Sequence, residues 1–181
     1  MKLAIISLGC SKNLVDSENM IGILVNRKGF ELTNNIEDAD VAIVNTCGFI
    51  GDAKEESVQN ILEVSQYKTT GKLKKLIVTG CLAQRYSQDI IQEMPEVDAV
   101  IGTGEIGKIE EIMDEVLAGK KIVKTESFDF LMSSDTDRIL TTFPHTAYVK
   151  IAEGCNRKCS YCIIPQLRGE LRSRSIEDIV E

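Results

Sequence analysis

Short apolar runs alternate along the first two-thirds of the chain with longer stretches that have amphipathic spacing. Runs of strand length occur at Leu3–Ile6, Val41–Val44, Leu76–Val78 and Val97–Ile101, and an edge strand is expected at Ile122–Lys124. Helical patterns cover about Asp16–Lys28, Asp52–Tyr67, Ser87–Met94 and Ile106–Leu117, with Asp52 as a capping residue. This alternation predicts an α/β fold for residues 1–125, a doubly wound, mostly parallel sheet with helices on both faces.

The pattern lapses into a polar stretch at residues 126–146, which is typical of a linker. A new strand is predicted at Ala147–Ile151, and Ser175 with Asp178 has the spacing of a helix cap. One strand, one loop and one helical turn cannot bury a core of their own. Residues 147–181 are therefore expected to be the poorly packed start of a second, truncated domain.

Charge and hydropathy narrow the class of protein. No stretch approaches the ~20 apolar residues that span a bilayer, and the opening run is too short for a signal peptide, so we expect a cytoplasmic protein without membrane contact. The net charge of −7 makes nucleic acid an improbable partner of this region. Residues 1–145 carry 15 basic and 23 acidic side chains, a balance that would attract a basic partner.

Three cysteines, Cys155, Cys159 and Cys162, form a CxxxCxxC motif directly after the predicted strand. Because a reducing cytosol disfavours disulfides, metal ligation is the favoured interpretation. Three thiolates can bind three irons of a 4Fe-4S cluster and leave the fourth open to S-adenosylmethionine, whose adenine the ring of Tyr161 is placed to contact. A zinc site is the alternative, but it needs a fourth ligand, and His145 is poorly placed to supply one.

The other three cysteines, Cys10, Cys47 and Cys81, each follow a predicted strand within a few residues, and a glycine adjoins each of them. The carboxyl ends of parallel strands meet at one edge of a sheet, where ligands commonly bind. These cysteines are therefore predicted to hold a second 4Fe-4S cluster there. The alternative is that they are three ordinary buried core residues.

Two further motifs are ambiguous. Gly102–Gly107 has GxGxxG spacing, and Glu126 stands where a ribose contact would be expected. A glycine turn into a helix is favoured over dinucleotide binding, because almost no sheet follows this motif. Arg168, Arg172 and Arg174 fit a solvated loop and a contact with cofactor, cluster or substrate equally well.

Taken together, the motifs resemble those of the radical SAM methylthiotransferases, and within them the ribosomal-protein (RimO) type. The similar segments are SLGCSKNLVDSE (7–18), NTCGFI (45–50), TGCLAQRY (79–86) and YVKIAEGCNRKCSYCIIPQLRGELRSRS (148–175). All six cysteines fall on motif positions of the family. The opening around Leu8 and Ser11–Asn13 differs from that of the tRNA-modifying sister type.

The resemblance implies two 4Fe-4S clusters and S-adenosylmethionine as cofactors. One S-adenosylmethionine would methylate sulfur held at Cys10, Cys47 and Cys81, and a second would be cleaved to a radical at Cys155, Cys159 and Cys162. That radical would take a hydrogen from an aspartate β-carbon in a small-subunit ribosomal protein, and the carbon radical would attack the methylthio group. An electron donor, which the sequence does not specify, is also implied. Methylthiolation of a tRNA adenosine and a non-enzymatic nucleotide-binding or electron-relay module are the alternatives. Family members continue into a full barrel and a TRAM domain, so this polypeptide alone is expected to be inactive.

Overall fold

The computed structural model describes residues 1–181 and contains a six-stranded sheet in which every neighbouring pair is parallel. The strands are β1 (Lys2–Ser7), β2 (Glu31–Leu32), β3 (Val41–Thr46), β4 (Lys75–Gly80), β5 (Ala99–Ile101) and β6 (Ile122–Lys124), and their order is β2-β1-β3-β4-β5-β6. The predicted α/β class with a mostly parallel sheet is therefore confirmed. Only the short edge strand β2 has no counterpart in the apolar pattern.

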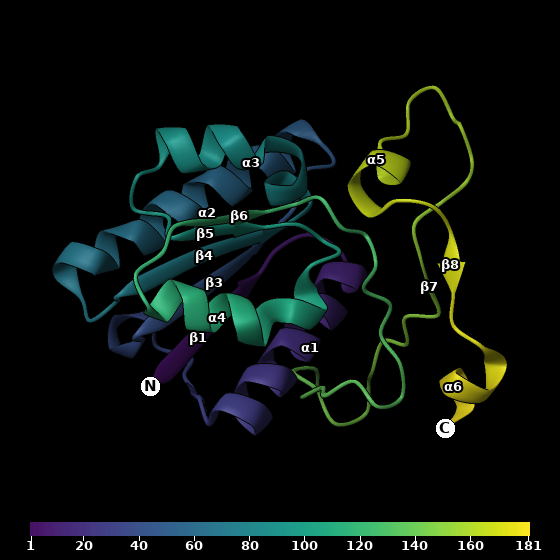
Figure 1. Ribbon diagram of the computed structural model, residues 1–181, viewed down its shortest axis with the longest axis horizontal. Coiled ribbons are helices and arrows are strands. Elements are labelled where there is room, and N and C mark those ends of the chain that lie inside the picture. Colours follow the sequence, from purple (N-terminus) through teal and green to yellow (C-terminus); the bar gives the residue numbers. More distant parts are fainter.

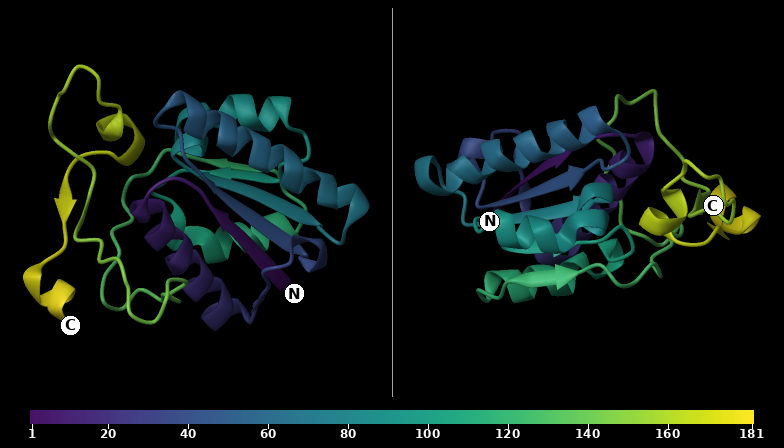
Figure 2. Two further views of the ribbon diagram at one scale, coloured as in Figure 1. Left: turned by 180° about the vertical axis from the view of Figure 1, so that it is seen from behind. Right: turned by 90° about the horizontal axis from the view of Figure 1, so that it is seen from above.

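Helices cover both faces of the sheet (Figures 1 and 2). One layer holds α1 (Ser11–Lys28) and α4 (Ile109–Leu117), and the other holds α2 (Gly51–Thr70) and α3 (Cys81–Glu93). Successive residues of β3 serve opposite layers, since Ile43 packs with the α1/α4 core and Val44 with the α2/α3 core. Burial on both faces explains why the first four residues of this strand, Val41–Val44, are an uninterrupted apolar run.

The register of the three central strands brings their carboxyl ends level. Asn45 of β3 is paired with Ser7 of β1 on one side and with Thr79 of β4 on the other. The chain therefore leaves all three strands at the same edge of the sheet. In Figure 1 this edge faces the C-terminal segment of the chain.

Two helices begin earlier than their apolar pattern predicts. α1 begins at Ser11 rather than at Asp16, and α3 begins at Cys81 rather than at Ser87. The expected cap at Asp52 is wrong, because α2 begins at Gly51 and its N-cap residue makes no side-chain hydrogen bond. In α1 the additional turn carries the buried polar residue Asn13, and hydrophobic periodicity does not detect such a residue.

The predicted strand at Ala147–Ile151 is also wrong. Here the elements are β7 (Ala152–Glu153), which pairs antiparallel with β8 (Arg172–Ser173), and the short helices α5 (Ile164–Arg168) and α6 (Ile176–Val180). A strand needs a backbone neighbour along its length, whereas in 147–151 only the Ile151 carbonyl has one, accepting from the N–H of Arg174 at 3.0 Å, and the apolar residues here are largely exposed. The predicted cap of α6 is confirmed, since the Ser175 hydroxyl accepts a hydrogen bond of 3.2 Å from the Asp178 N–H.

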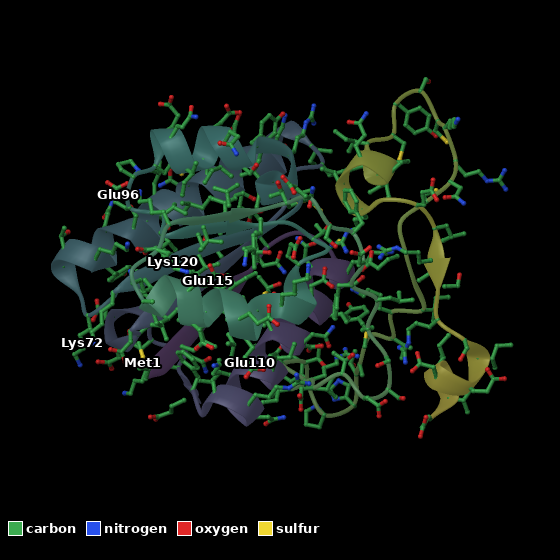
Figure 3. The ribbon with its side chains drawn as sticks, viewed as in Figure 1. Met1, Lys72, Glu96, Glu110, Glu115 and Lys120 are labelled. Carbon is green, nitrogen blue, oxygen red and sulfur yellow. The ribbon has the colours of Figure 1, made fainter.

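The connecting segment, residues 126–146, runs along α1 and then leads to the C-terminal segment (Figure 1). The N–H of Ile139 donates to the carbonyl of Glu18 at 3.1 Å, and the backbone at Asp137 lies so close to Gly22 that a side chain there would clash. The charged side chains of Lys72 and Glu96 lie at the other end of the sheet domain (Figure 3). None of the helices combines the length and the apolar character needed to cross a membrane.

Candidate metal centres

Cys10, Cys47 and Cys81 lie in the three loops that leave the central strands at their shared edge. Cys10 is the N-cap residue of α1, Cys47 directly follows β3, and Cys81 is the first residue of α3. The sequence positions had indicated this edge, and the level register of the strands explains how residues so distant in sequence reach it.

Glycines let these loops approach one another closely. A Cβ on Gly9 would lie 2.7 Å from Cβ and 3.0 Å from Sγ of Cys47, and one on Gly48 would lie 3.0 Å from the carbonyl carbon of Cys81. Gly9 also has a φ of +88°, which side-chain-bearing residues avoid. The backbone before Cys10 therefore touches Cys47, and the backbone after Cys47 touches Cys81.

The three thiols of this first triad differ in exposure. Cys10 is exposed, Cys47 is half-buried and Cys81 is buried. Burial raises the pKa of the Cys81 thiol, the guanidinium of Arg168 opposes this effect, and the nearby thiols of Cys10 and Cys47 raise it further. Bound iron would reverse this tendency, because a coordinating thiol loses its proton to the metal.

Asn13 ties the first turn of α1 to the loops of the triad. Its Nδ2 donates to the carbonyls of Leu8 at 2.9 Å and Thr46 at 3.0 Å, and its Oδ1 lies 3.9 Å from Sγ of Cys81. In turn, Nδ2 of Asn45 donates to the Asn13 carbonyl at 2.8 Å. These bonds hold the loop backbones, so the thiols are carried on a fixed frame.

The second triad lies in a loop whose ends are joined. The N–H of Cys155 donates to the carbonyl of Gly169 at 3.1 Å, and the N–H of Cys162 donates to the carbonyl of Cys159 at 3.1 Å. Cys159 is exposed, whereas Cys155 and Cys162 are half-buried. All three thiols are thus carried on one closed loop that is accessible from solvent.

A cavity of about 480 Å³ lies between the loops that carry the two triads, and Cys162 is the cysteine that lines it. Phe49 and Ile50, which follow Cys47, line it together with Cys162 and Tyr161 of the second loop and Arg85 of α3. Tyr161 is 88% exposed, so its ring is free of packing contacts that would occupy it. The loops that carry the two triads therefore share one hollow.

No group of three or more histidine, cysteine or carboxylate side chains is gathered tightly enough to hold a single metal ion. A cubane cluster makes a different demand, because each thiolate binds a different iron and the sulfurs stand further apart. Gly9 and Gly48 let the three cysteine loops come close enough to share such a group, and the thiols of Cys10 and Cys47 are accessible to it. The residues present at the first triad thus fit an anionic cluster better than a zinc ion.

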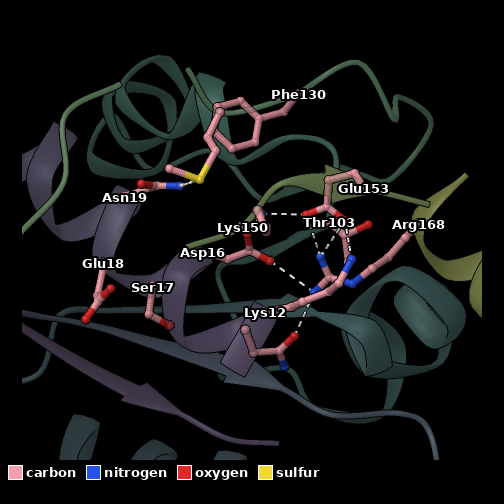
Figure 4. Close-up of polar contacts among 12 residues, drawn as sticks. Lys12, Asp16, Ser17, Glu18, Asn19, Thr103, Phe130, Lys150, Glu153 and Arg168 are labelled. Carbon is pink, nitrogen blue, oxygen red and sulfur yellow. Dashed lines mark hydrogen bonds and ion pairs between the residues drawn. The ribbon is translucent and has the colours of Figure 1, made fainter. Parts of the chain in front are cut away.

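A buried ring of alternating charges joins the sheet domain to the C-terminal segment (Figure 4). Lys150 contacts both Asp16 and Glu153, and Arg168 contacts the same two carboxylates, at 3.0 Å and 2.9 Å. Each side chain of this ring is 6% exposed or less. Asp16 belongs to α1, and the other three residues belong to the segment that carries the second triad.

Mutual neutralisation accounts for the burial of these four charges, since each has two neighbours of the opposite sign. Burial disfavours the charged form of Glu153, but Arg168 and Lys150 outweigh it and hold the pKa of this carboxyl below its usual value. Burial likewise opposes the guanidinium charge, yet Asp16 and Glu153 raise the pKa of Arg168.

Sequence reasoning missed this ring. A signal was present in the run of polar residues at 16–19, because an amphipathic helix would not bury four consecutive polar side chains without partners. The three arginines that the sequence left ambiguous are also resolved. Arg168 is buried, Arg172 donates to the carbonyl of Phe130 at 3.4 Å, and Arg174 pairs with Asp178 at 2.6 Å.

The glycines of the GxGxxG motif pack against the chain itself. A Cβ on Gly102 would lie 2.1 Å from Oε1 of Gln84, one on Gly104 would lie 2.1 Å from the Ser127 carbonyl oxygen, and one on Gly107 would touch the ring of Phe130. The space next to these glycines is thus filled by protein atoms. This packing favours the glycine-turn interpretation over dinucleotide binding.

Comparison with known proteins places these features in context. The model of a family described as "Uncharacterized protein family UPF0004" matches residues 2–102. Over its whole length the chain is 54% identical to "Ribosomal protein uS12 methylthiotransferase RimO" of Lachnoclostridium phytofermentans and 52% identical to the protein of that name from Clostridioides difficile. It spans 41% and 40% of the length of these two relatives.

Proposed function

Because the chain belongs to the UPF0004 family, whose model covers strands β1 to β5, we propose that it forms the cluster-binding part of a radical SAM methylthiotransferase that modifies a small-subunit ribosomal protein. The relatives named as uS12 methylthiotransferases support this substrate. The modified group would be an aspartate side chain, attacked at its β-carbon. The location would be cytoplasmic.

Two clusters are assigned to named residues under this proposal. Cys10, Cys47 and Cys81 would hold a sulfur-delivering 4Fe-4S cluster, supported by the contacts of Gly9 and Gly48 with the neighbouring cysteine loops. Cys155, Cys159 and Cys162 would hold the cluster that binds S-adenosylmethionine, with Tyr161 beside the adenine. The chemistry that such clusters supply is reductive cleavage of S-adenosylmethionine at one site and sulfur donation at the other.

The division of the chain follows from the same proposal. Residues 1–125 would form the methylthiotransferase domain, 126–146 a linker, and 147–181 the start of a radical SAM barrel. The cluster loop would then be completed by the strands of that barrel. The exposed apolar side chains of Val149 and Ile151 support this, because a barrel would cover them.

The observation that carries the proposal is the cavity between the two triads. Radical attack and sulfur transfer require the substrate carbon to reach both reacting centres, and this cavity adjoins Cys162 on one side and the residues after Cys47 on the other. Arg85 is the one cationic side chain among its lining residues. Its guanidinium would pair with the carboxylate of the substrate aspartate and orient the β-carbon.

The test uses the full-length protein reconstituted with iron and sulfide under anaerobic conditions. It is incubated with S-adenosylmethionine, a reductant and the purified ribosomal protein, and the products are analysed by mass spectrometry. The expected result is a gain of one methylthio group on one aspartate, together with 5′-deoxyadenosine. Methylthiolation of tRNA with an unmodified ribosomal protein would contradict the proposal.

Two controls make this test specific. Omitting the reductant should abolish both products, because reductive cleavage needs an electron. A Cys47→Ala variant should still form 5′-deoxyadenosine but no methylthio product, since only the sulfur-delivering site is removed. Product formation by this variant would show that sulfur comes from elsewhere.

A further inference from the structure

We propose that Arg168 is a positioning residue, whose guanidinium fixes the loop of the second triad against the rim of the first and so sets the separation of the two metal centres. This inference rests on the proposed function, because only a reaction that uses two metal centres needs a fixed distance between them. The contacts of Arg168 that support it do not depend on that function. None of the comparisons assigns a role to this residue.

The two ends of the guanidinium bind different parts of the molecule. Nη1 donates to both carboxylate oxygens of Glu153, at 2.9 and 3.1 Å. Nη2 donates to Oδ1 of Asn13 at 2.8 Å and to Oδ2 of Asp16 at 3.0 Å. One planar group therefore links α1 of the sheet domain to the base of the second loop.

Two of these partners, Asn13 and Glu153, lie close in sequence to a cysteine of one triad. Asn13 is three residues after Cys10, and its Oδ1 also approaches Sγ of Cys81. Glu153 is two residues before Cys155, so it lies at the entrance of the second loop. Arg168 itself ends α5, which follows Cys162 and closes that loop. A shift of the guanidinium would thus change the position of the loops that carry both triads.

Few other contacts of the C-terminal segment are buried. From residue 147 onward only Lys150, Glu153, Leu167 and Arg168 are buried, and three of them belong to the ring of alternating charges. The Leu167 carbonyl adds one bond, accepting from the Thr103 hydroxyl at 2.6 Å. The segment is therefore better anchored than its sequence predicts, and Arg168 lies at the centre of its buried charged contacts.

A lysine at this position would not hold the two parts of the molecule in the same relative position. Lysine would keep the positive charge of the ring, but its ammonium group is a single point, whereas the arginine fork presents donors in fixed directions to two partners at once. Arg168→Lys therefore separates positioning from charge balance. If Arg168 only neutralised Asp16 and Glu153, lysine would serve equally well.

The experiment uses the full-length protein, with Arg168→Lys, Arg168→Gln and the control Arg157→Gln. Arg157 is exposed in the same loop, and only its backbone contacts a candidate ligand, with its N–H 3.4 Å from Sγ of Cys155. Two readouts are independent of turnover. One is hydrogen exchange of residues 150–169 before reconstitution, and the other is the magnetic interaction between the two reduced clusters in electron paramagnetic resonance after it.

For Arg168→Lys we expect unchanged iron content, exchange of residues 150–169 faster by about tenfold, and a weakened or broadened interaction signal. Arg157→Gln should match the wild type in all three. If Arg168→Gln fails to fold, Arg168→Lys still decides. A lysine variant with wild-type exchange and wild-type magnetic interaction would overturn the positioning role.

The same samples separate this inference from the proposed function. Faster exchange and altered interaction in Arg168→Lys support positioning even if the wild type forms no methylthio product, an outcome that would count against the function alone. Where the wild type is active, the lysine variant should lose about a hundredfold in kcat with little change in KM for the ribosomal protein, because misplacement by ~1 Å has this effect on rate. Full activity with disturbed geometry would contradict the inference.

Discussion

The carboxylate of Glu18 receives the guanidinium of Arg138 at 2.7 Å, although 120 residues separate them in the sequence. Glu18 is completely buried, and its other oxygen accepts from the N–H and the hydroxyl of Thr141 at 2.8 and 3.0 Å. This carboxylate therefore holds the connecting segment onto α1. The segment that reads as a polar linker is thus held by a buried charge in addition to its backbone contacts with α1.

Replacing that charge should loosen the whole segment. Glu18→Gln would leave Arg138 facing a neutral amide, and we expect the free energy of unfolding to fall by about 3 kcal/mol, as when one partner of a buried pair is removed. Urea denaturation measures this. The control is Asp38→Asn, which removes the partner of Lys72 at the exposed far end of the domain and should leave stability unchanged within error.

Adding one methyl group beside the first triad should lower the iron content of the reconstituted protein. Gly9→Ala would place Cβ 3.0 Å from Sγ of Cys47 at a positive φ, so the thiol must move. We expect about half of the iron to be lost, because the second triad is untouched, and iron analysis after reconstitution measures this. The matched control is Gly29→Ala, which has a positive φ of +67° but no atom within 4 Å of the added Cβ. It should lower stability by about 1 kcal/mol and keep all the iron.

The two triads should bind iron independently. Cys81→Ala should remove the cluster of the first triad and leave the spectrum of the second, and Cys159→Ala should do the reverse. Each variant is thus the control for the other. Loss of all iron from either single variant would contradict the assignment of three cysteines to each centre.

Arg85 should affect binding of the ribosomal protein more than the rate of the bound complex. Arg85→Gln removes the cation that lines the cavity, so KM for the substrate should rise about tenfold or more, in line with the loss of a charge-assisted hydrogen bond. Steady-state kinetics of the full-length enzyme measures this. Lys121→Gln, an exposed change near the Pro95 carbonyl, is the control and should alter neither KM nor kcat.

Acid should destabilise the sheet domain through its paired carboxylates. The ammonium group of Lys74 and the N–H of Lys2 hold the pKa of Asp40 below its ordinary value, against a smaller opposing effect of burial. Since the folded-state pKa is the lower one, the stabilisation is complete above about pH 4 and is lost as pH falls through the folded value. Asp40→Asn should flatten the dependence of unfolding free energy on pH in that range, whereas the exposed Asp135→Asn should not.

Much of the fold could be read from the sequence because the central strands are buried on both faces. Such strands appear as continuous apolar runs, and Val41–Val44 is one. The glycine beside each cysteine also indicated the edge of the sheet, since the loops there pack closely. These features are local, and local patterns are what sequence reasoning detects.

The ring of alternating charges could not be predicted in the same way. Asp16 is separated from Lys150 by 134 residues and from Arg168 by 152, and no periodicity relates such positions. The helix start at Ser11 was missed for a related reason, because Asn13 and Asp16 are buried by partners from other segments. The strand expected at Ala147–Ile151 failed because its residues have strand propensity, but only Ile151 at its end has a backbone partner.

The register of β3 against its neighbouring strands determines where Cys47 lies. A strand that is apolar throughout would tolerate slipping by a residue past its neighbours, because either face would still meet hydrocarbon. Asn45 forbids this, since its amide reaches Asn13 and the Ser17 hydroxyl only in one alignment. Asn45, two residues before Cys47, thus fixes the register of β3, and this register determines the position of the Cys47 sulfur.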